Sequence, residues 1–181
     1  MPPVVSATVP ARDRCLPVVE VLAAMLPDAG LMRGHVVGCS GSAAWSLALA
    51  LTARATATGS WLAIVGASTV GVEAAAEHGN VLEHVVSVAV DGGSTVWAER
   101  VAAAADGFEL IATCPPVGAE RVVRKVRQRI KAKGAVLLVV DRVSPSVACD
   151  LDLSARHIEW VGLGQGSGRL LSHRVAIRVA G

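Results

Sequence analysis

Gly38-Cys39-Ser40-Gly41-Ser42-Ala43-Ala44-Trp45-Ser46 is the stretch that decides the fold. It lies between a short apolar segment and a long segment rich in leucine and alanine, which is the strand, loop and helix order of a phosphate-binding loop. Such a loop, G-x-x-x-x-G-K-[ST], uses its second glycine for close backbone approach, its lysine for phosphate and its hydroxyl for magnesium. Counted from Gly38, those three positions hold Ala43, Ala44 and Trp45. We therefore predict that the frame of the loop, with Gly38 and Gly41, is kept as scaffold without its nucleotide chemistry.

The segments around this loop alternate between strand and helix patterns. Apolar runs rich in β-branched residues predict strands over 35–38, 61–66, 84–90, 109–113 and 135–141. Helical spacing of apolar residues predicts helices over 16–26, 42–57, 70–76, 96–105 and 117–133. Segments 156–163 and 170–179 flank a glycine-rich turn and predict a terminal hairpin. We expect an α/β fold with a three-layer αβα core and a mainly parallel central sheet that ends in an antiparallel C-terminal hairpin.

Composition limits the domain organisation and the class of protein. The 181 residues suit one domain over 16–181, preceded by a flexible leader over 1–15. The chain is 52% hydrophobic with a mean hydropathy of +0.52, so an apolar surface for a partner is expected. It has no uncharged apolar run long enough to span a membrane and no secretory signal, which predicts a cytoplasmic protein without membrane contact. The four cysteines are far apart in sequence, so no metal or cofactor site is predicted.

A basic amphipathic helix is predicted near the middle of the second half of the chain. Seven cations lie between Arg121 and Lys133, opposite an apolar stripe formed by Val122, Val123, Val126 and Ile130. Two interpretations stay open: the cations contact the phosphates of a nucleic acid, or they form an ordinary solvated helix face. The candidates for nucleic-acid contact are Arg121, Arg124, Lys125 and Arg127.

The order of these segments resembles the core of the RecA ATPase family. The resemblance rests on the Leu-Pro-x-x-Gly-Leu sequence at 26–31, the loop at Gly38, strands at 62–66, 85–90, 108–114 and 136–141, and the closing segment 172–179. The chain departs from that family at its catalytic positions. Gly66-Ala67-Ser68 stands where the family has its catalytic glutamate, and the strand that should end in the Walker-B aspartate ends in Cys114. Because phosphoryl transfer depends on these groups for electrostatic stabilisation, we expect no enzymatic activity and no catalytic residue.

Among inactive RecA-like proteins, the short chain rich in Ala, Val and Arg resembles the ImuA-prime family of the actinobacterial mutasome. That resemblance implies an adaptor in SOS-induced translesion synthesis and mutagenesis, which binds ImuB, supports an error-prone polymerase and approaches DNA indirectly within the polymerase complex. It also implies association with the nucleoid after DNA damage. The alternatives are a SulA-like division inhibitor that binds FtsZ and a residual P-loop ATPase.

The resemblance also implies where the partner binds. RecA-type domains associate when an N-terminal helix and strand of one molecule add to the sheet of another, which is a form of β-augmentation. The exposed edge is expected at the third strand of the core, 84–90, where a RecA-N-terminus-like segment of ImuB would dock. The expected partner-binding residues are Val86, Val88, Val90, Trp97 and Val101, and the alternative is that they are ordinary core residues.

Overall fold

A seven-stranded sheet forms the centre of the molecule. The computed structural model describes residues 14–141, 148–163 and 168–180. The strand order is β5-β4-β6-β7-β3-β8-β9. In chain order the sheet contains β3 (Val36–Ser40), β4 (Leu62–Val65), β5 (Val85–Val88), β6 (Leu110–Thr113), β7 (Val136–Val140), β8 (Leu151–Leu163) and β9 (Gly168–Ala180). The first six of these strands run parallel to their neighbours, and β9 runs antiparallel to β8.

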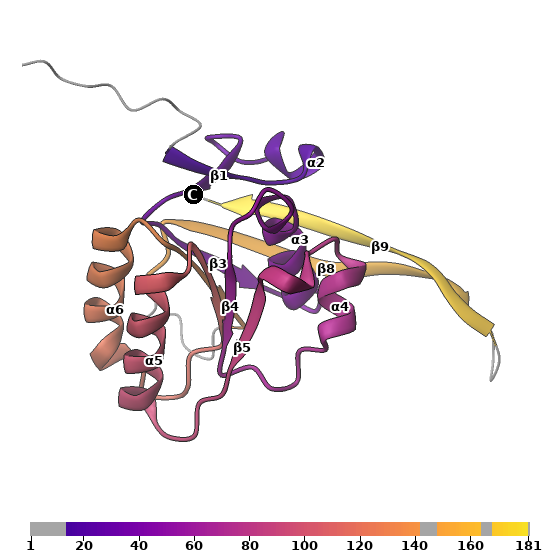
Figure 1. Ribbon diagram of the computed structural model, residues 1–181. Helices are drawn as coiled ribbons and strands as arrows, with labels where there is room; N and C mark the ends of the chain where they lie inside the picture. Colours follow the sequence, from indigo (N-terminus) through magenta and orange to yellow (C-terminus); the bar gives the residue numbers. More distant parts are fainter. Residues whose placement is uncertain (1–13, 142–147, 164–167, 181) are drawn as a thin grey trace, which may run out of the picture.

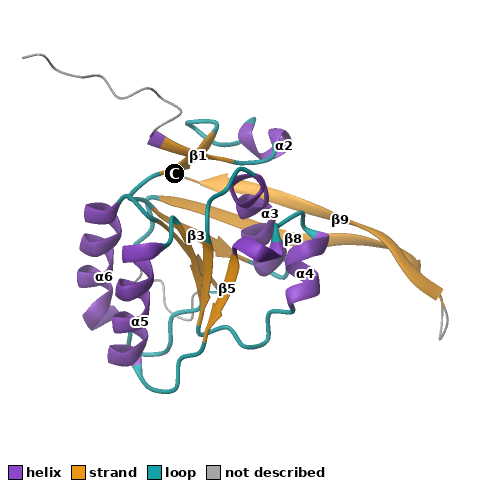
Figure 2. Ribbon diagram, viewed as in Figure 1, coloured by secondary structure: helices purple, strands orange, loops and turns teal. Residues whose placement is uncertain are grey.

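Helices cover both faces of the sheet (Figure 2). On one face α3 (Ala44–Ala57) and α4 (Val72–Glu77) pack over a core cluster that includes Leu47 and Leu51. On the other face α5 (Ser94–Gly107) and α6 (Glu120–Lys133) pack over a second cluster, which includes Val101 and Ile130. All five residues of β7 are buried, as expected for a strand covered on both sides. The predicted α/β class and three-layer core are therefore confirmed.

The predicted C-terminal hairpin is also confirmed, and its strands are longer than predicted. β8 pairs with β3 only through Leu151 to Ser154, because β3 ends at Ser40. Beyond that point β8 and β9 continue together as a two-stranded ribbon that extends away from the helices (Figure 1). The glycine-rich turn at 164–167 lies outside the described residues.

The predicted helix over 16–26 is wrong for most of its length. Cys15–Pro17 forms strand β1, which pairs antiparallel with β2 (Gly30–Met32), and only α2 (Glu20–Ala23) is helical. Pro17 has no amide hydrogen and disfavours helical backbone at the residue before it, so the helix does not begin until after this residue. Of the predicted leader, residues 1–13 lie outside the described residues, and Cys15 lies in β1.

One further element, a 3-10 helix, completes the elements of the described residues. This helix, η1 (Leu82–His84), leads into β5. No helix within the described ranges is long and apolar enough to cross a membrane.

Candidate functional site

The degenerate loop joins β3 to α3 at the carboxyl end of the parallel strands. Gly38 lies within β3, opposite Val139 on one side and Asp152 on the other. Gly41 has a positive φ of 95°, a backbone conformation that favours glycine. This is the place where an open α/β sheet ordinarily binds a ligand, so the contacts of the loop decide what it can do.

The loop is fastened to the hairpin strand β8. The amide of Ala43 donates a hydrogen bond to the carbonyl oxygen of Ala155 at 3.1 Å. The hydroxyl oxygen of Ser42 accepts one from the amide of His157, also at 3.1 Å. A Cβ added at Gly41 would lie 2.2 Å from the Ala155 oxygen, so β8 packs directly on the loop backbone. In a phosphate-binding loop such a backbone amide is available to the ligand, whereas the Ala43 amide is hydrogen-bonded to the carbonyl of Ala155.

The replaced positions of the loop are part of the core. Ala43 and Ala44 are each 2% exposed, and Trp45 packs partly buried against the cluster beneath α3. A side chain at either alanine therefore points into packed protein rather than into an open cradle. Apolar packing at these positions holds the start of α3 in place. In an active loop, a bound nucleotide contacts the start of this helix instead.

Polar groups at the neighbouring strand ends form hydrogen bonds within the protein. Trp97 donates a hydrogen bond from its indole nitrogen to the Thr113 hydroxyl at 2.7 Å, and that hydroxyl donates to the Val65 carbonyl at 2.8 Å. Cys114, in place of the Walker-B acid, has its pKa raised by burial and, secondarily, by the charge of Asp141. Its thiol is therefore protonated at neutral pH and is a poor nucleophile or metal ligand. Burial likewise raises the pKa of the Asp141 carboxyl.

The structure confirms that the third strand of the core, β5, is an edge of the sheet. Val88 and Val90 pack partly buried toward α5 and α6, whereas Val85 packs toward α3. Of the five residues expected to contact a partner, Trp97 is 1% exposed and Val101 is fully buried, so these two support the edge from beneath. The partly exposed residues are Val86, Val88 and Val90.

Backbone direction at β5 determines which groups face outward. The Gly66 amide donates to the Val88 carbonyl at 2.9 Å, so the polar groups of Val88 point toward β4. Because backbone direction alternates along a strand, the amide and carbonyl of Ser87 point to the open edge. Ser87 and Ala89 are exposed.

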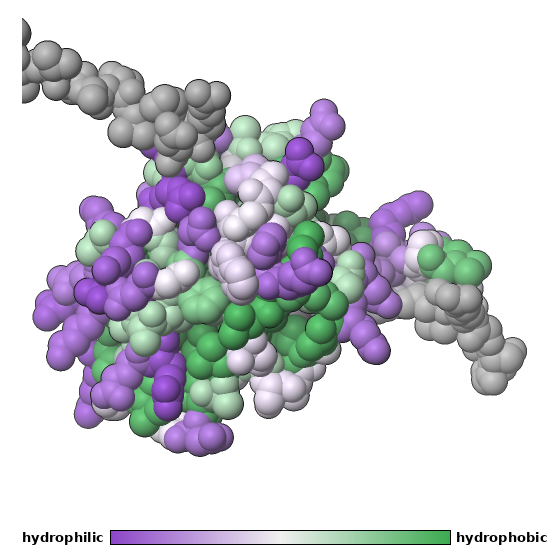
Figure 3. Space-filling model, viewed as in Figure 1, coloured by the Kyte–Doolittle hydropathy of each residue, from purple (hydrophilic) through white to green (hydrophobic). Residues whose placement is uncertain are grey.

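Sequence reasoning missed the apolar surface beside this edge. Trp61 is 42% exposed, Leu82 39% and Val72 61%. The Trp61 ring lies 5.2 Å from the ring of His84, at the start of β5. Figure 3 shows apolar side chains gathered over the part of the surface where β5 and α4 lie. The sequence signal for this surface was Trp61, which directly follows the Thr58-Gly59-Ser60 turn and precedes the buried strand β4.

The cations of α6 fall into groups with different surroundings. Arg129 and Lys133 both form ion pairs with Asp106 of α5, at 2.6 and 3.1 Å. Hydrogen bonds from Arg129 and then from Lys133 lower the pKa of the Asp106 carboxyl. Arg127 pairs with Asp150 at 2.7 Å. The remaining cations of the helix form no ion pair with any other described residue: Arg121, Arg124, Lys125 and Lys131.

Residues 24–145 match the family model of the MT3502 N-terminal domain. The chain belongs to the MT3502 N-terminal domain family. No curated protein matches the chain. The part shared with the MT3502 N-terminal domain family contains the degenerate loop, the β5 edge and α6, whereas the hairpin β8–β9 lies beyond the matched residues.

The hairpin adds a cluster of rings to this member of the MT3502 N-terminal domain family. The rings of Trp160, His157 and His173 contact one another, with centroids of Trp160 4.4 and 5.0 Å from the two histidines and the histidines 5.3 Å apart. Ile158 is 57% exposed and Leu171 74%. The sequence predicted the hairpin but not this cluster, because the cluster depends on the register of β8 with β9.

Proposed function

We propose that the protein is a catalytically inactive RecA-like adaptor in SOS-induced translesion synthesis, which binds ImuB and supports an error-prone polymerase. The observation that carries the proposal is the contrast between two features of one sheet. The loop that would hold a nucleotide is bound to β8 through Ala43, whereas the β5 edge has outward polar groups and no strand beside it among the described residues. The choice of ImuB as partner follows from the family resemblance, and with it the location at the nucleoid after DNA damage.

Strand addition at β5 is the proposed mode of binding. A partner segment with a RecA-like N-terminal strand would pair with the outward amide and carbonyl of Ser87. Main-chain hydrogen bonds supply affinity in this mode, and neighbouring apolar residues supply specificity. Trp61 and Leu82, exposed beside the start of β5, are suited to hold an apolar residue of the segment.

Ser87→Pro tests strand addition at β5 by removing one backbone amide hydrogen. Proline removes the outward amide hydrogen, and an edge strand tolerates it there because no hydrogen bond of the sheet is lost. We expect the affinity for ImuB to fall roughly ten-fold or more, as for loss of a main-chain bond plus crowding by the ring. Ser87→Ala, which keeps the amide, is the matched control and should bind as the wild type does. Equal binding of all three proteins, measured by titration calorimetry, would count against strand addition at β5.

Two further titrations separate the alternatives. Binding of FtsZ without binding of ImuB would replace the adaptor by a division inhibitor. Micromolar, magnesium-dependent affinity for ATP would instead favour a residual ATPase.

A further inference from the structure

A pocket of about 320 Å³ lies between α6 and the turn that joins β2 to β3. Its charged or titratable lining residues are Arg33, His35, Arg124, Arg127, Lys131 and Asp150. We call this the turn-helix pocket. Gly34 has a φ of 82°, and a Cβ added there would lie 3.4 Å from the Cα of Lys131, so the turn approaches α6 closely. The pocket is at the amino end of β3, remote from the degenerate loop at its carboxyl end.

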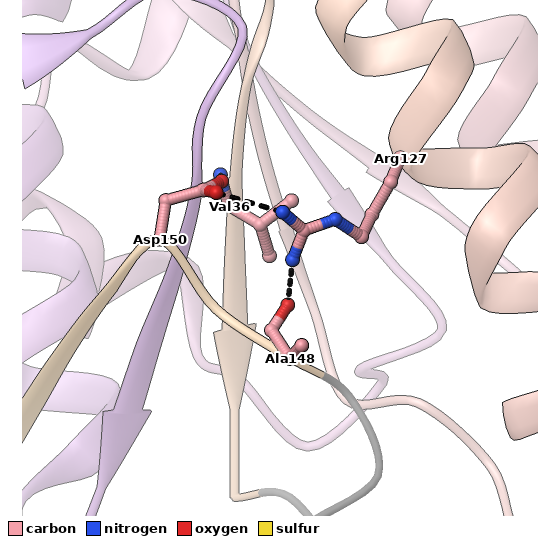
Figure 4. Close-up of polar contacts among 4 residues, drawn as sticks. All are labelled: Val36, Arg127, Ala148 and Asp150. Atoms are coloured by element: carbon pink, nitrogen blue, oxygen red, sulfur yellow. Dashed lines mark hydrogen bonds and ion pairs between the residues drawn. The ribbon is translucent and has the colours of Figure 1, made fainter.

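One acidic residue lines the pocket, and it is already engaged. The Asp150 carboxylate accepts hydrogen bonds from the Val36 amide at 2.8 Å and from Arg127 at 2.7 Å. Arg127 also donates to the carbonyl of Ala148 (Figure 4). Asp150 therefore neutralises and orients Arg127 and does not pair with the other pocket cations.

Three cations converge on the pocket without an acidic partner among the described residues. They are Arg33 from the turn and Arg124 and Lys131 from one side of α6. Arg124 and Lys131 are seven residues apart, so they lie on the same side of the helix, about 10 Å apart along its axis. The paired cations Arg129 and Lys133 lie on the other side, toward α5. Figure 3 shows hydrophilic residues gathered over the α6 side of the molecule.

We infer that the turn-helix pocket binds backbone phosphates of a nucleic acid, through Arg33, Arg124 and Lys131. Guanidinium groups bind phosphate oxygens with paired hydrogen bonds, and an ammonium group adds a point charge. Among the described lining residues there is no tryptophan, phenylalanine or tyrosine, so the cations are the main contacts and we expect binding that depends little on base sequence. The choice of a nucleic acid over another phosphate compound rests on the proposed function.

The inference divides the four residues first considered for nucleic-acid contact. Arg124 is a direct contact, whereas Arg127 lines the pocket but is already paired with Asp150. Arg121 and Lys125 do not line it. Arg33 and Lys131 are the additions that only the fold could supply.

Fluorescence anisotropy of the protein alone, with labelled single-stranded and duplex DNA over a range of salt concentrations, tests the inference. Arg124→Gln/Lys131→Gln should weaken binding about ten-fold or more at low salt and flatten the dependence of log K on log salt by about 1.4 for single strands and 1.8 for duplexes. Arg33→Gln, on a different element, should flatten it by about 0.7 for single strands.

The matched control is Arg129→Gln/Lys133→Gln, which removes the same formal charge from the same helix. Because both cations pair with Asp106 on the side of α6 away from the pocket, we expect affinity and salt slope to change little. Equal losses of affinity in the two double variants would show that only net charge matters and would refute the inference that the pocket binds phosphate. Failure of the wild-type protein to bind single-stranded or duplex DNA would refute it as well. Circular dichroism and thermal unfolding establish that each variant is folded.

Inorganic phosphate at constant ionic strength distinguishes a free anion from a nucleic acid. We expect millimolar phosphate to leave the DNA complex intact, and its displacement of DNA would assign the pocket to free phosphate instead. ImuB is absent from these measurements, so failure here leaves the β5 proposal standing, and failure of ImuB binding leaves the pocket standing.

Discussion

Gly41→Ala measures how tightly the hairpin closes the degenerate loop. An added Cβ has two separate costs at this position. A left-handed backbone with φ of 95° costs a non-glycine residue about 1–2 kcal/mol. The new atom would also lie 2.2 Å from the carbonyl oxygen of Ala155, and displacing packed backbone costs a further 1–3 kcal/mol or so. We therefore expect a total loss in the free energy of unfolding of about 2–5 kcal/mol.

Gly59→Ala separates these two costs. Gly59 has a similar φ of 101°, and an added Cβ there meets no atom within 4 Å. Both variants lose the same unfolded-state freedom, so the difference between them reports the contact with β8. We expect Gly41→Ala to be less stable than Gly59→Ala by about 1–3 kcal/mol in urea unfolding, with a melting temperature lower by several degrees. Equal stabilities would refute the claim that β8 packs on the loop.

Three other substitutions probe the support of the site. Trp97→Phe removes the hydrogen bond to Thr113 from a buried position and should cost about 2–4 kcal/mol in urea unfolding, whereas a loss below 0.5 kcal/mol would argue against that contact. Asn80→Ala removes a buried side chain that bonds to Leu49 of α3, to Ala75 of α4 and to the Thr52 hydroxyl, and should cost about 2–4 kcal/mol by the same assay; an unchanged midpoint would contradict this. Burial, and secondarily the charge of His173, lower the pKa of His78 from its ordinary value of 6.5. The unfolded chain therefore binds the proton more tightly than the folded protein does, and the free energy of unfolding should fall as the pH drops below about 6.5. His78→Gln should reduce that fall in thermal scans, and an unchanged pH profile would exclude His78 as its source.

The parallel core could be predicted because its strands have a strong local signal. Each predicted strand of the core is a short run of apolar residues between turn or helix signals, and in β7 all five residues are apolar and buried. Local patterns failed at the N-terminus, where Val19, Leu22, Ala23 and Leu26 have helical spacing. There the pairing of Leu16 with Leu31 in β2 and the backbone of Pro17 prevail over periodicity.

For the candidate site, the sequence predicted which chemical groups are missing but not how the loop is packed. Counting from Gly38 located the missing lysine and hydroxyl, since those positions are fixed by the motif. The closure of the loop depends on contacts between residues more than a hundred positions apart, such as Ala43 with Ala155, and no local pattern encodes them. The cations of α6 were likewise equivalent in sequence, and only the fold brings Asp106 and Asp150 to some of them and Arg33 to others.

Amide hydrogen exchange of the full chain, with and without ImuB, tests the central claim most directly. We expect ImuB to slow exchange at the outward amide of Ser87 in β5, while the amides of β9, at the opposite edge of the sheet, exchange as before. Protection that is confined to β9 or to α6, with β5 unchanged, would contradict the claim that the sheet is extended at β5.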